Sequence, residues 1–174
     1  MKLLNYLVLL VSVSFLLCCG KEEKEVIIYE AGNQEFGWAT GTKEGAQWEA
    51  SGYWQYHLND STLTSIKFVT YNSEGVQREK ISIGYIPLSE GTLSIKRNPD
   101  VNNGIARGSY SMSDGDVSLG GLEVNENENS YITISQIDSL TNTIKGFFEV
   151  YFISESGGLK VEIKDGEFEV RPYE

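Results

Sequence analysis

The sequence is poor in the side chains that most often build catalytic and metal sites. Among 174 residues it has one histidine, His57, and two cysteines, the adjacent Cys18 and Cys19. A Ser-His-Asp arrangement would have to use His57 as its base, and no G-x-S-x-G nucleophile elbow or phosphate-cradling glycine motif occurs. An ordinary His/Cys zinc site needs more ligands than these. We therefore expect no catalytic residue, no metal site and no cofactor, in a protein that is not an enzyme.

The chain also lacks a hydrophobic run long enough to cross a membrane as a helix. Its longest apolar stretch extends from Tyr6 to Leu17, whereas a membrane-spanning helix needs about 20 residues. Lys2 provides one positive charge before this stretch. A basic start followed by a short apolar segment is typical of a cleaved secretory signal. The sequence therefore predicts a signal peptide over residues 1–18.

The end of this signal carries the two cysteines. Leu16-Leu17-Cys18-Cys19 resembles a bacterial lipobox, and the resemblance implies that Cys19 is the residue that receives lipid. The alternative is a plain signal that ends in a disulfide or in two inert thiols. Several acyl chains give durable attachment, because each buried methylene contributes about 0.8 kcal/mol. We expect the membrane to be a partner of the mature chain, through a lipid anchor on Cys19.

A run of charged residues follows directly. Lys21, Glu22, Glu23, Lys24 and Glu25 would form a solvated tether of residues 19–25 in the simplest interpretation. Short acidic runs at this position also resemble the export signal of Bacteroidota lipoproteins that reach the cell surface. That resemblance implies an outer-membrane protein displayed on the surface, and the alternative is an anchored protein that faces the periplasm.

Basic residues are few compared with acidic ones. The chain has 14 Lys and Arg against 25 Asp and Glu, for a net charge of −11. Removal of the signal deletes Lys2 and no acid, which leaves 13 − 25 = −12. Nucleic acids are bound mainly through Lys and Arg on phosphates. The composition therefore argues against a nucleic-acid partner and favours a soluble, self-repelling surface.

The rest of the chain has the pattern of a β-protein. Apolar residues alternate with polar ones in several short segments, and turn-forming residues separate them. We expect a single all-β domain over residues 26–174, built as an antiparallel β-sandwich or barrel. Within it, Ile81, Ile83 and Tyr85 are expected on one face. Gly120-Gly121 and Asp165-Gly166 are expected to break or turn the chain. The alternating segments are 62–71, 76–85, 92–96, 131–137, 143–154 and 159–163.

Three motifs carry a resemblance to a known group. They are Gly45-Ala-Gln-Trp48-Glu-Ala50, Ile134-Ser-Gln-Ile-Asp138 and Ile144-Lys-Gly146-Phe-Phe148. They resemble the opening strand and the C-terminal hairpin of a family of small, uncharacterised Bacteroidota lipoprotein β-domains. The resemblance implies an all-β surface or periplasmic domain without agreed chemistry, in which Trp48 belongs to the core.

Aromatic residues are concentrated near the start of this domain. Trp38, Trp48, Tyr53, Trp54 and Tyr56 lie close together in the sequence. Aromatic rings along a strand can stack on sugars or line the mouth of a barrel, because they offer a large contact area at low entropic cost. Besides a role in the core, we therefore consider Trp38, Trp54 and Tyr56 as candidate ligand contacts.

Two further motifs are weaker. Asp138-Ser139-Leu140 resembles the sequon of Bacteroidota protein O-glycosylation, which makes Ser139 a candidate modification site, and 60–62 resembles it less well. Asn98, Asp100 and Asn102 are spaced like calcium ligands, but the glycine and glutamate that complete an EF-hand loop are absent. A plain polar loop and a looser calcium site within Asn98–Asp116 both remain open.

These observations converge on a lipid-anchored binding or accessory protein of the cell envelope. We expect its partner to be a glycan or an outer-membrane protein. The alternative is a lipocalin-like carrier or periplasmic assembly factor with an apolar cavity, and a more remote one is a small hydrolase that uses acidic residues. An exposed aromatic strip would favour surface binding, whereas an aromatic-lined cavity would favour the carrier.

Overall fold

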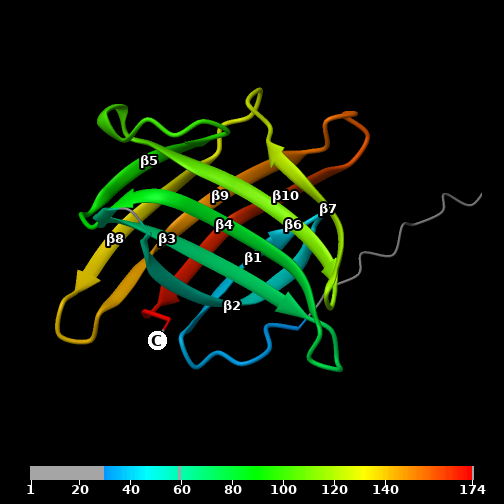
Figure 1. Ribbon diagram of the computed structural model, residues 1–174, viewed down its shortest axis with the longest axis horizontal. Helices are drawn as coiled ribbons and strands as arrows, with labels where there is room; N and C mark the ends of the chain where they lie inside the picture. The colour runs from blue at the N-terminus through cyan, green and yellow to red at the C-terminus, as the bar shows by residue number, and fades with distance from the viewer. Residues whose placement is uncertain (1–29, 59, 174) are drawn as a thin grey trace, which may run out of the picture.

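The computed structural model describes residues 30–58 and 60–173 (Figure 1). The predicted signal peptide, Cys19 and the charged run from Lys21 to Glu25 lie outside the described residues. The all-β prediction is confirmed. Ten strands are present, together with the short 3₁₀ helix η1 (Val101–Asn103): β1 (Gly37–Lys43), β2 (Ala46–His57), β3 (Asp60–Tyr71), β4 (Gln77–Pro87), β5 (Gly91–Lys96), β6 (Ile105–Asp114), β7 (Val117–Val124), β8 (Tyr131–Asp138), β9 (Thr143–Ile153) and β10 (Lys160–Val170).

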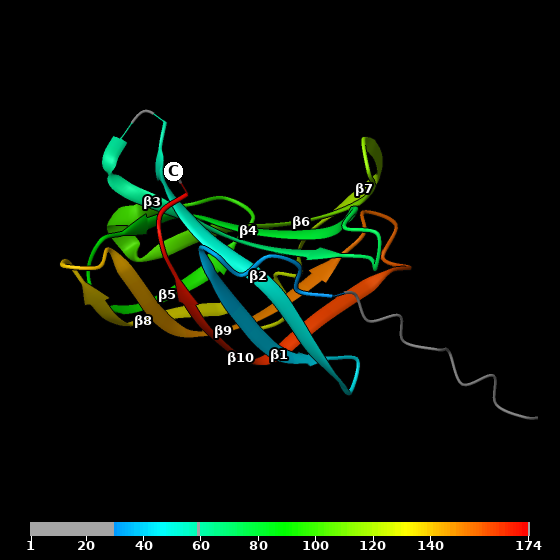
Figure 2. The same ribbon diagram turned by 90° about the horizontal axis from the view of Figure 1, so that it is seen from below.

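The strands form one sheet that closes on itself. Their order is β10-β1-β2-β3-β4-β6-β5-β8-β9, and β10 also pairs with β9 to complete a nine-stranded, barrel-like ring. Where β5 and β8 have ended, β7 pairs with both β6 and β9 and so connects these two strands. Figure 2 shows β3, β4 and β6 above and β8, β9, β10 and β1 below, with β2 crossing from one layer to the other. Of the two predicted arrangements, the structure has the barrel-like one.

The ring has two distinct ends. At one end lie the β1–β2, β3–β4, β6–β7 and β9–β10 turns, and the described chain begins there, where Glu30 pairs with Tyr71. We call it the entry end. The β2–β3, β4–β5 and β8–β9 turns lie at the opposite end, which we call the far end (Figures 1 and 2).

Aromatic rings fill the middle of the barrel. Trp48, Phe68, Phe148 and Phe168 are each at most 1% exposed. The rings of Phe68 and Phe148 stack at 4.7 Å, and Trp48 meets both of them edge-on at 6.4 and 6.2 Å. Such pairs contribute about 0.5–1.5 kcal/mol beyond the area that they bury. The expectation that Trp48 belongs to the core is therefore met by its position.

Three local expectations were wrong, and β-bulges or continuous strands explain each. Ile86, not Tyr85, follows Ile81 and Ile83 inside the barrel, because the register of β3 and β4 shifts beside Ser65. Gly120-Gly121 continues β7 rather than breaking it. Asp165-Gly166 is a bulge inside β10, where the register shifts against both β9 and β1. A bulge inserts one residue without ending the strand.

The segment before β1 covers the outer wall of β2 and β3. Ser51 lies on this wall, and its hydroxyl donates to the carbonyl oxygens of Ala31 and, at 2.6 Å, Asn33. Val69 pairs with Ser51 across the strands and is only 2% exposed although it faces outward. Among the described residues, no helix is long and apolar enough to cross a membrane.

Replacement of Trp48 by alanine should lower the free energy of unfolding by about 3–5 kcal/mol, because it leaves a cavity beside the rings of Phe68 and Phe148. Urea denaturation followed by circular dichroism measures this loss. Trp38→Ala serves as the control, since Trp38 lies half-buried on the outer wall and should cost less. An unchanged unfolding midpoint for Trp48→Ala would contradict the packing described above.

Candidate binding surface at the far end of the barrel

Exposed apolar side chains gather on the turns of the far end. Leu58 and Leu140 are 96% and 94% exposed, Tyr56 is 53% exposed, and Leu88 is 38% exposed. Tyr56 lies near the end of β2, and the three leucines lie in the β2–β3, β8–β9 and β4–β5 connections, which are at the same end in both views (Figures 1 and 2). Large apolar side chains that are exposed at one end of a domain can form an interaction site. We call Tyr56, Leu58, Leu88 and Leu140 the apolar rim.

Trp54 forms the floor beneath this rim. Its side chain is 4% exposed, and its indole Nε1 donates at 2.9 Å to the carbonyl oxygen of Asn142 in the β8–β9 turn. The ring of Tyr56 stands perpendicular to it at 5.1 Å. The structure thus brings together two predicted ligand contacts, Trp54 and Tyr56, and Tyr56 is the one that offers its surface to solvent. Trp54 ties one turn of the rim to another.

The turn that presents Leu140 is held by hydrogen bonds. Oδ1 of Asp138 accepts from the backbone N–H groups of Leu140 at 2.9 Å and Thr141 at 3.3 Å. Bonds from the Thr141 side chain and from these backbone groups lower the pKa of the exposed Asp138 carboxyl. Ser139 lies exposed in the same turn, next to Leu140. Its O-glycosylation stays a prediction, at a position that the structure makes accessible.

His57 lies in the side wall of the rim. Its ring contacts that of Tyr85 at 4.6 Å with the two planes tilted by 44°, and Tyr85 has a left-handed φ of 62° at the β4 bulge. The bulge turns Tyr85 away from the core, as bulges commonly re-aim a side chain. Nδ1 of His57 is buried and has no hydrogen-bond partner among the described residues. The contact of the His57 ring that the structure shows is with Tyr85.

Trp38, the third predicted ligand contact, lies elsewhere. It faces outward from β1, between Ser51 of β2 and Glu169 of β10. Farther along the same wall, the ring of Tyr173 contacts Phe36 at 5.2 Å and Tyr53 at 4.8 Å. Desolvation, followed by the neighbouring tyrosines, raises the pKa of Tyr53. This cluster holds the two ends of the described chain against the wall.

A buried polar network lies inside the barrel toward the entry end. Lys43 of β1 forms an ion pair with Oε1 of Glu79 from β4, and the hydroxyl of Tyr110 donates to the same oxygen at 2.5 Å. Thr70 donates to the other oxygen, Oε2, at 3.2 Å. Lys43 and Glu79 are 8% and 4% exposed. Both carboxylate oxygens are thus engaged, which makes Glu79 a structural group rather than an available base.

A hollow of about 330 Å³ opens at the entry end. Tyr151 lies in it, and its hydroxyl donates to Glu149. That hydrogen bond raises the pKa of Tyr151 to about 12, with help from desolvation and from the nearby carboxylates Glu162 and Glu128. In the part of the chain that the structure describes, no group of three or more His, Cys, Asp or Glu residues could hold a metal ion. Other residues line the same hollow: Glu44, Asn125, Phe152, Lys160 and Val161.

The residues considered for a calcium site within Asn98–Asp116 lie in two separate places in the fold. Asp100 precedes η1 before β6, whereas Asp114 ends β6 and Asp116 follows it at the entry end. The whole strand therefore separates them. Oδ2 of Asp100 accepts from Nδ2 of Asn103 at 2.8 Å, as expected for a plain polar loop.

Comparison with known proteins gave no match: no family model, no curated protein and no solved structure is similar to this chain. The likeness to small Bacteroidota lipoprotein domains therefore stays a prediction from three motifs. Sequence reasoning missed Leu58, Leu88 and Leu140, although an isolated leucine between turn-forming residues is a signal that could have found them.

Glu79→Ala should destabilise the protein by about 3–5 kcal/mol, because it leaves the Lys43 ammonium buried without its partner. Asp114→Ala is the matched control. It removes an ion pair with Arg78 in which the Asp114 side chain is 58% exposed, and such pairs contribute about 0–1 kcal/mol. Urea denaturation compares the two. Equal losses would contradict a structural role for the network.

Proposed function

We propose that this protein is a lipid-anchored binding or accessory component of the cell envelope, held by Cys19 and displayed at the outer membrane. Its apolar rim binds an outer-membrane protein. The observation that carries the proposal is the near-complete exposure of Leu58 and Leu140 on turns of one barrel end. Leucine side chains favour an apolar protein surface over a glycan, because sugars stack on aromatic rings and Tyr56 is one aromatic residue among three leucines in the rim.

The direction of the chain supports this arrangement. The described part begins at the entry end, where Glu30 bridges to Tyr71. The anchor would join the domain from that side, eleven residues before Glu30. A chain of this length reaches at most about 36–40 Å when extended. The far end and its rim are then free to point away from the lipid and toward a partner.

The interior favours binding at the surface over the carriage of an apolar ligand. Trp48, Phe68, Phe148 and Phe168 are in ring contact across the middle of the barrel. A lipocalin-like carrier would need that volume for its ligand. An acidic hydrolase would need two carboxylates in one cleft. The hollow at the entry end has Glu44, Glu128 and Glu162 in its lining, while Glu79, buried in the described part of the chain, is bonded to Lys43, Thr70 and Tyr110.

The anchor is tested by metabolic labelling with palmitate. The wild-type chain should incorporate label, and Cys19→Ala should remain an unlabelled precursor, because it lacks the acylated sulfur. Protease treatment of intact cells then tests display. We expect cleavage of the wild-type domain and protection when the run from Lys21 to Glu25 is replaced by alanine. Normal labelling of Cys19→Ala would refute the anchor, and protection of the wild-type domain would refute surface display.

The rim is tested by photo-crosslinking on intact cells. A photoreactive residue at position 140 should form a discrete adduct with an envelope protein, since Leu140 is almost fully exposed. Addition of Leu58→Asp to the same chain should abolish the adduct, because it places a charge in an apolar contact. The control carries the photoreactive residue at Gln47, an exposed position on the outer wall of β2. Equal adducts from positions 140 and 47 would contradict the rim.

A further inference from the structure

A second interaction surface lies at the entry end, along one edge of β7. This strand pairs with β6 over most of its length but reaches β9 only through Glu123 and Val124. Among the described residues, no strand pairs with the other edge of 117–122. In an antiparallel pair, alternate residues direct their N–H and C=O groups away from the partner. This edge therefore presents backbone groups that another strand can bond.

A groove of about 600 Å³ runs beside this edge. Gly121, Leu122 and Glu123 of β7 line it on one side, and the β9–β10 turn lines the other with Ser154, Glu155 and Ser156. Ser109 and Tyr110 of β6 also contribute to its lining. A side chain built at Gly120 would meet no atom within 4 Å. The face of the strand is thus open at Gly120, whereas a Cβ at Gly121 would lie 3.3 Å from the carbonyl oxygen of Tyr110.

The β7 edge has one feature that protects edge strands, a bulge, but lacks the charged residues and proline that protect many others. Residues 117–122 read VSLGGL and contain no charge and no proline, whereas natural edges carry lysine, proline or a covering element. Val117 and Leu119 are each 61% exposed. A bulge at Leu119 bends the start of the strand, and the regular stretch begins at Gly120. An uncharged, glycine-containing edge beside a groove fits strand addition.

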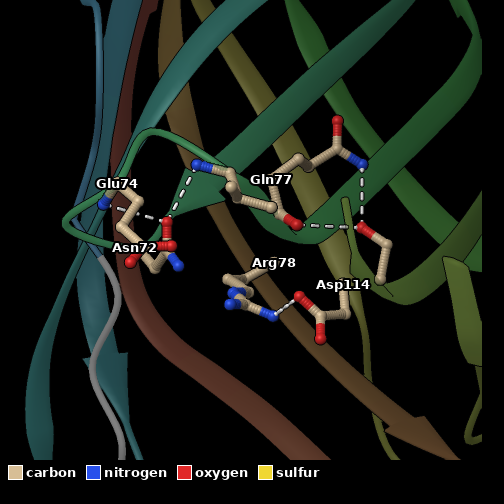
Figure 3. Close-up of polar contacts among 7 residues, drawn as sticks. Asn72, Glu74, Gln77, Arg78 and Asp114 are labelled. Carbon is tan, nitrogen blue, oxygen red and sulfur yellow. Dashed lines mark hydrogen bonds and ion pairs between the residues drawn. The ribbon is translucent and has the colours of Figure 1, made fainter. Parts of the chain in front are cut away.

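β6, the other strand of the β6–β7 hairpin, is firmly held by side-chain contacts, as Figure 3 shows. Arg78 at the start of β4 forms an ion pair with Asp114 at the end of β6. The hydroxyl of Ser113 donates at 3.1 Å to the carbonyl oxygen of Gln77. Oδ1 of Asn72 accepts from the backbone N–H of Glu74 at 3.1 Å and so orders the neighbouring turn. The hairpin is fixed through β6, which leaves the β7 edge presented on a rigid base.

We propose that the β7 edge binds an extended segment of another protein by strand addition, and that this segment alternates β-branched residues with lysine or arginine. The charge around the groove selects the occupant. Glu155 in the groove lining and Asp116 in the turn just before β7 have no ion-pair partner among the described residues, whereas Glu123 in the lining forms an ion pair with Arg97. The whole chain carries a net charge of −11. A second copy of this chain would bring the same negative charge, whereas a basic strand would neutralise it. This inference is independent of the apolar rim.

The test uses the full chain in mild detergent and a nine-residue probe peptide that alternates valine or threonine with lysine. The peptide should bind and should slow hydrogen exchange of the backbone amides within 117–122, because new inter-strand hydrogen bonds form there. Leu119→Lys should weaken binding by about tenfold, since it opposes like charges across the pair. Gln47→Lys adds the same charge on another wall and should bind as the wild type does.

A peptide of the same pattern with glutamate in place of lysine should not bind. Several results would overturn the proposal: no protection of 117–122 by the lysine peptide, equal binding by Leu119→Lys, or equal binding of the glutamate peptide. Protection that appears without peptide and rises with protein concentration would identify a second copy as the occupant instead. Protection without peptide that is independent of concentration would identify a segment of the same chain.

Discussion

The closure of the sheet through β10 is the constraint on which the rest of the structure depends. β10 pairs with β1 on one side and with β9 on the other, and so joins the first strand to the last hairpin. Its bulge at Asp165-Gly166 shifts the register against both neighbours at once. A Cβ at Gly166 would lie 2.6 Å from the ring and the carbonyl oxygen of Phe148. Only glycine lets the closing strand bend around that ring, which keeps the aromatic core and the ring closure compatible.

The barrel interior divides into zones along its axis. Aromatic rings occupy the middle, Trp54 closes the far end through its bond to Asn142, and the network around Glu79 lies toward the entry end. A buried ion pair adds little net stability, because desolvation of both charges offsets their attraction. Its value lies in fixing positions: Lys43, Thr70, Glu79 and Tyr110 come from four strands, and their bonds are satisfied when those strands adopt this register.

The sequence predicts the local elements better than their pairing. Alternation located most strands, because one face of each strand is buried, and the motif around Trp48 located a core residue. The alternation pattern failed at Tyr85 and Asp165-Gly166. There a bulge changes which residues face the core, and the bulge depends on pairing with strands far away in the sequence. Lys43 and Glu79 occupy interior positions of their strands, but nothing local shows that they meet across the barrel. Trp54 and Tyr56 share a site, whereas Trp38 lies outside it, because β1 shows its other face to the core.

The number of strands between β6 and β9 explains why a closed barrel retains an open edge. Toward the far end, both β5 and β8 lie between β6 and β9. Closer to the entry end, past the ends of β5 and β8, β7 is the one strand of the described chain between them. Paired strands lie about 4.8 Å apart, so the distance between β6 and β9 must fall by about one strand spacing along the axis. β7 bridges them where they are close enough, at Glu123 and Val124. Farther toward the entry end, β9 turns into β10 while β7 stays on β6, and the groove opens between them. The free edge is therefore a geometric consequence of the same topology that closes the ring.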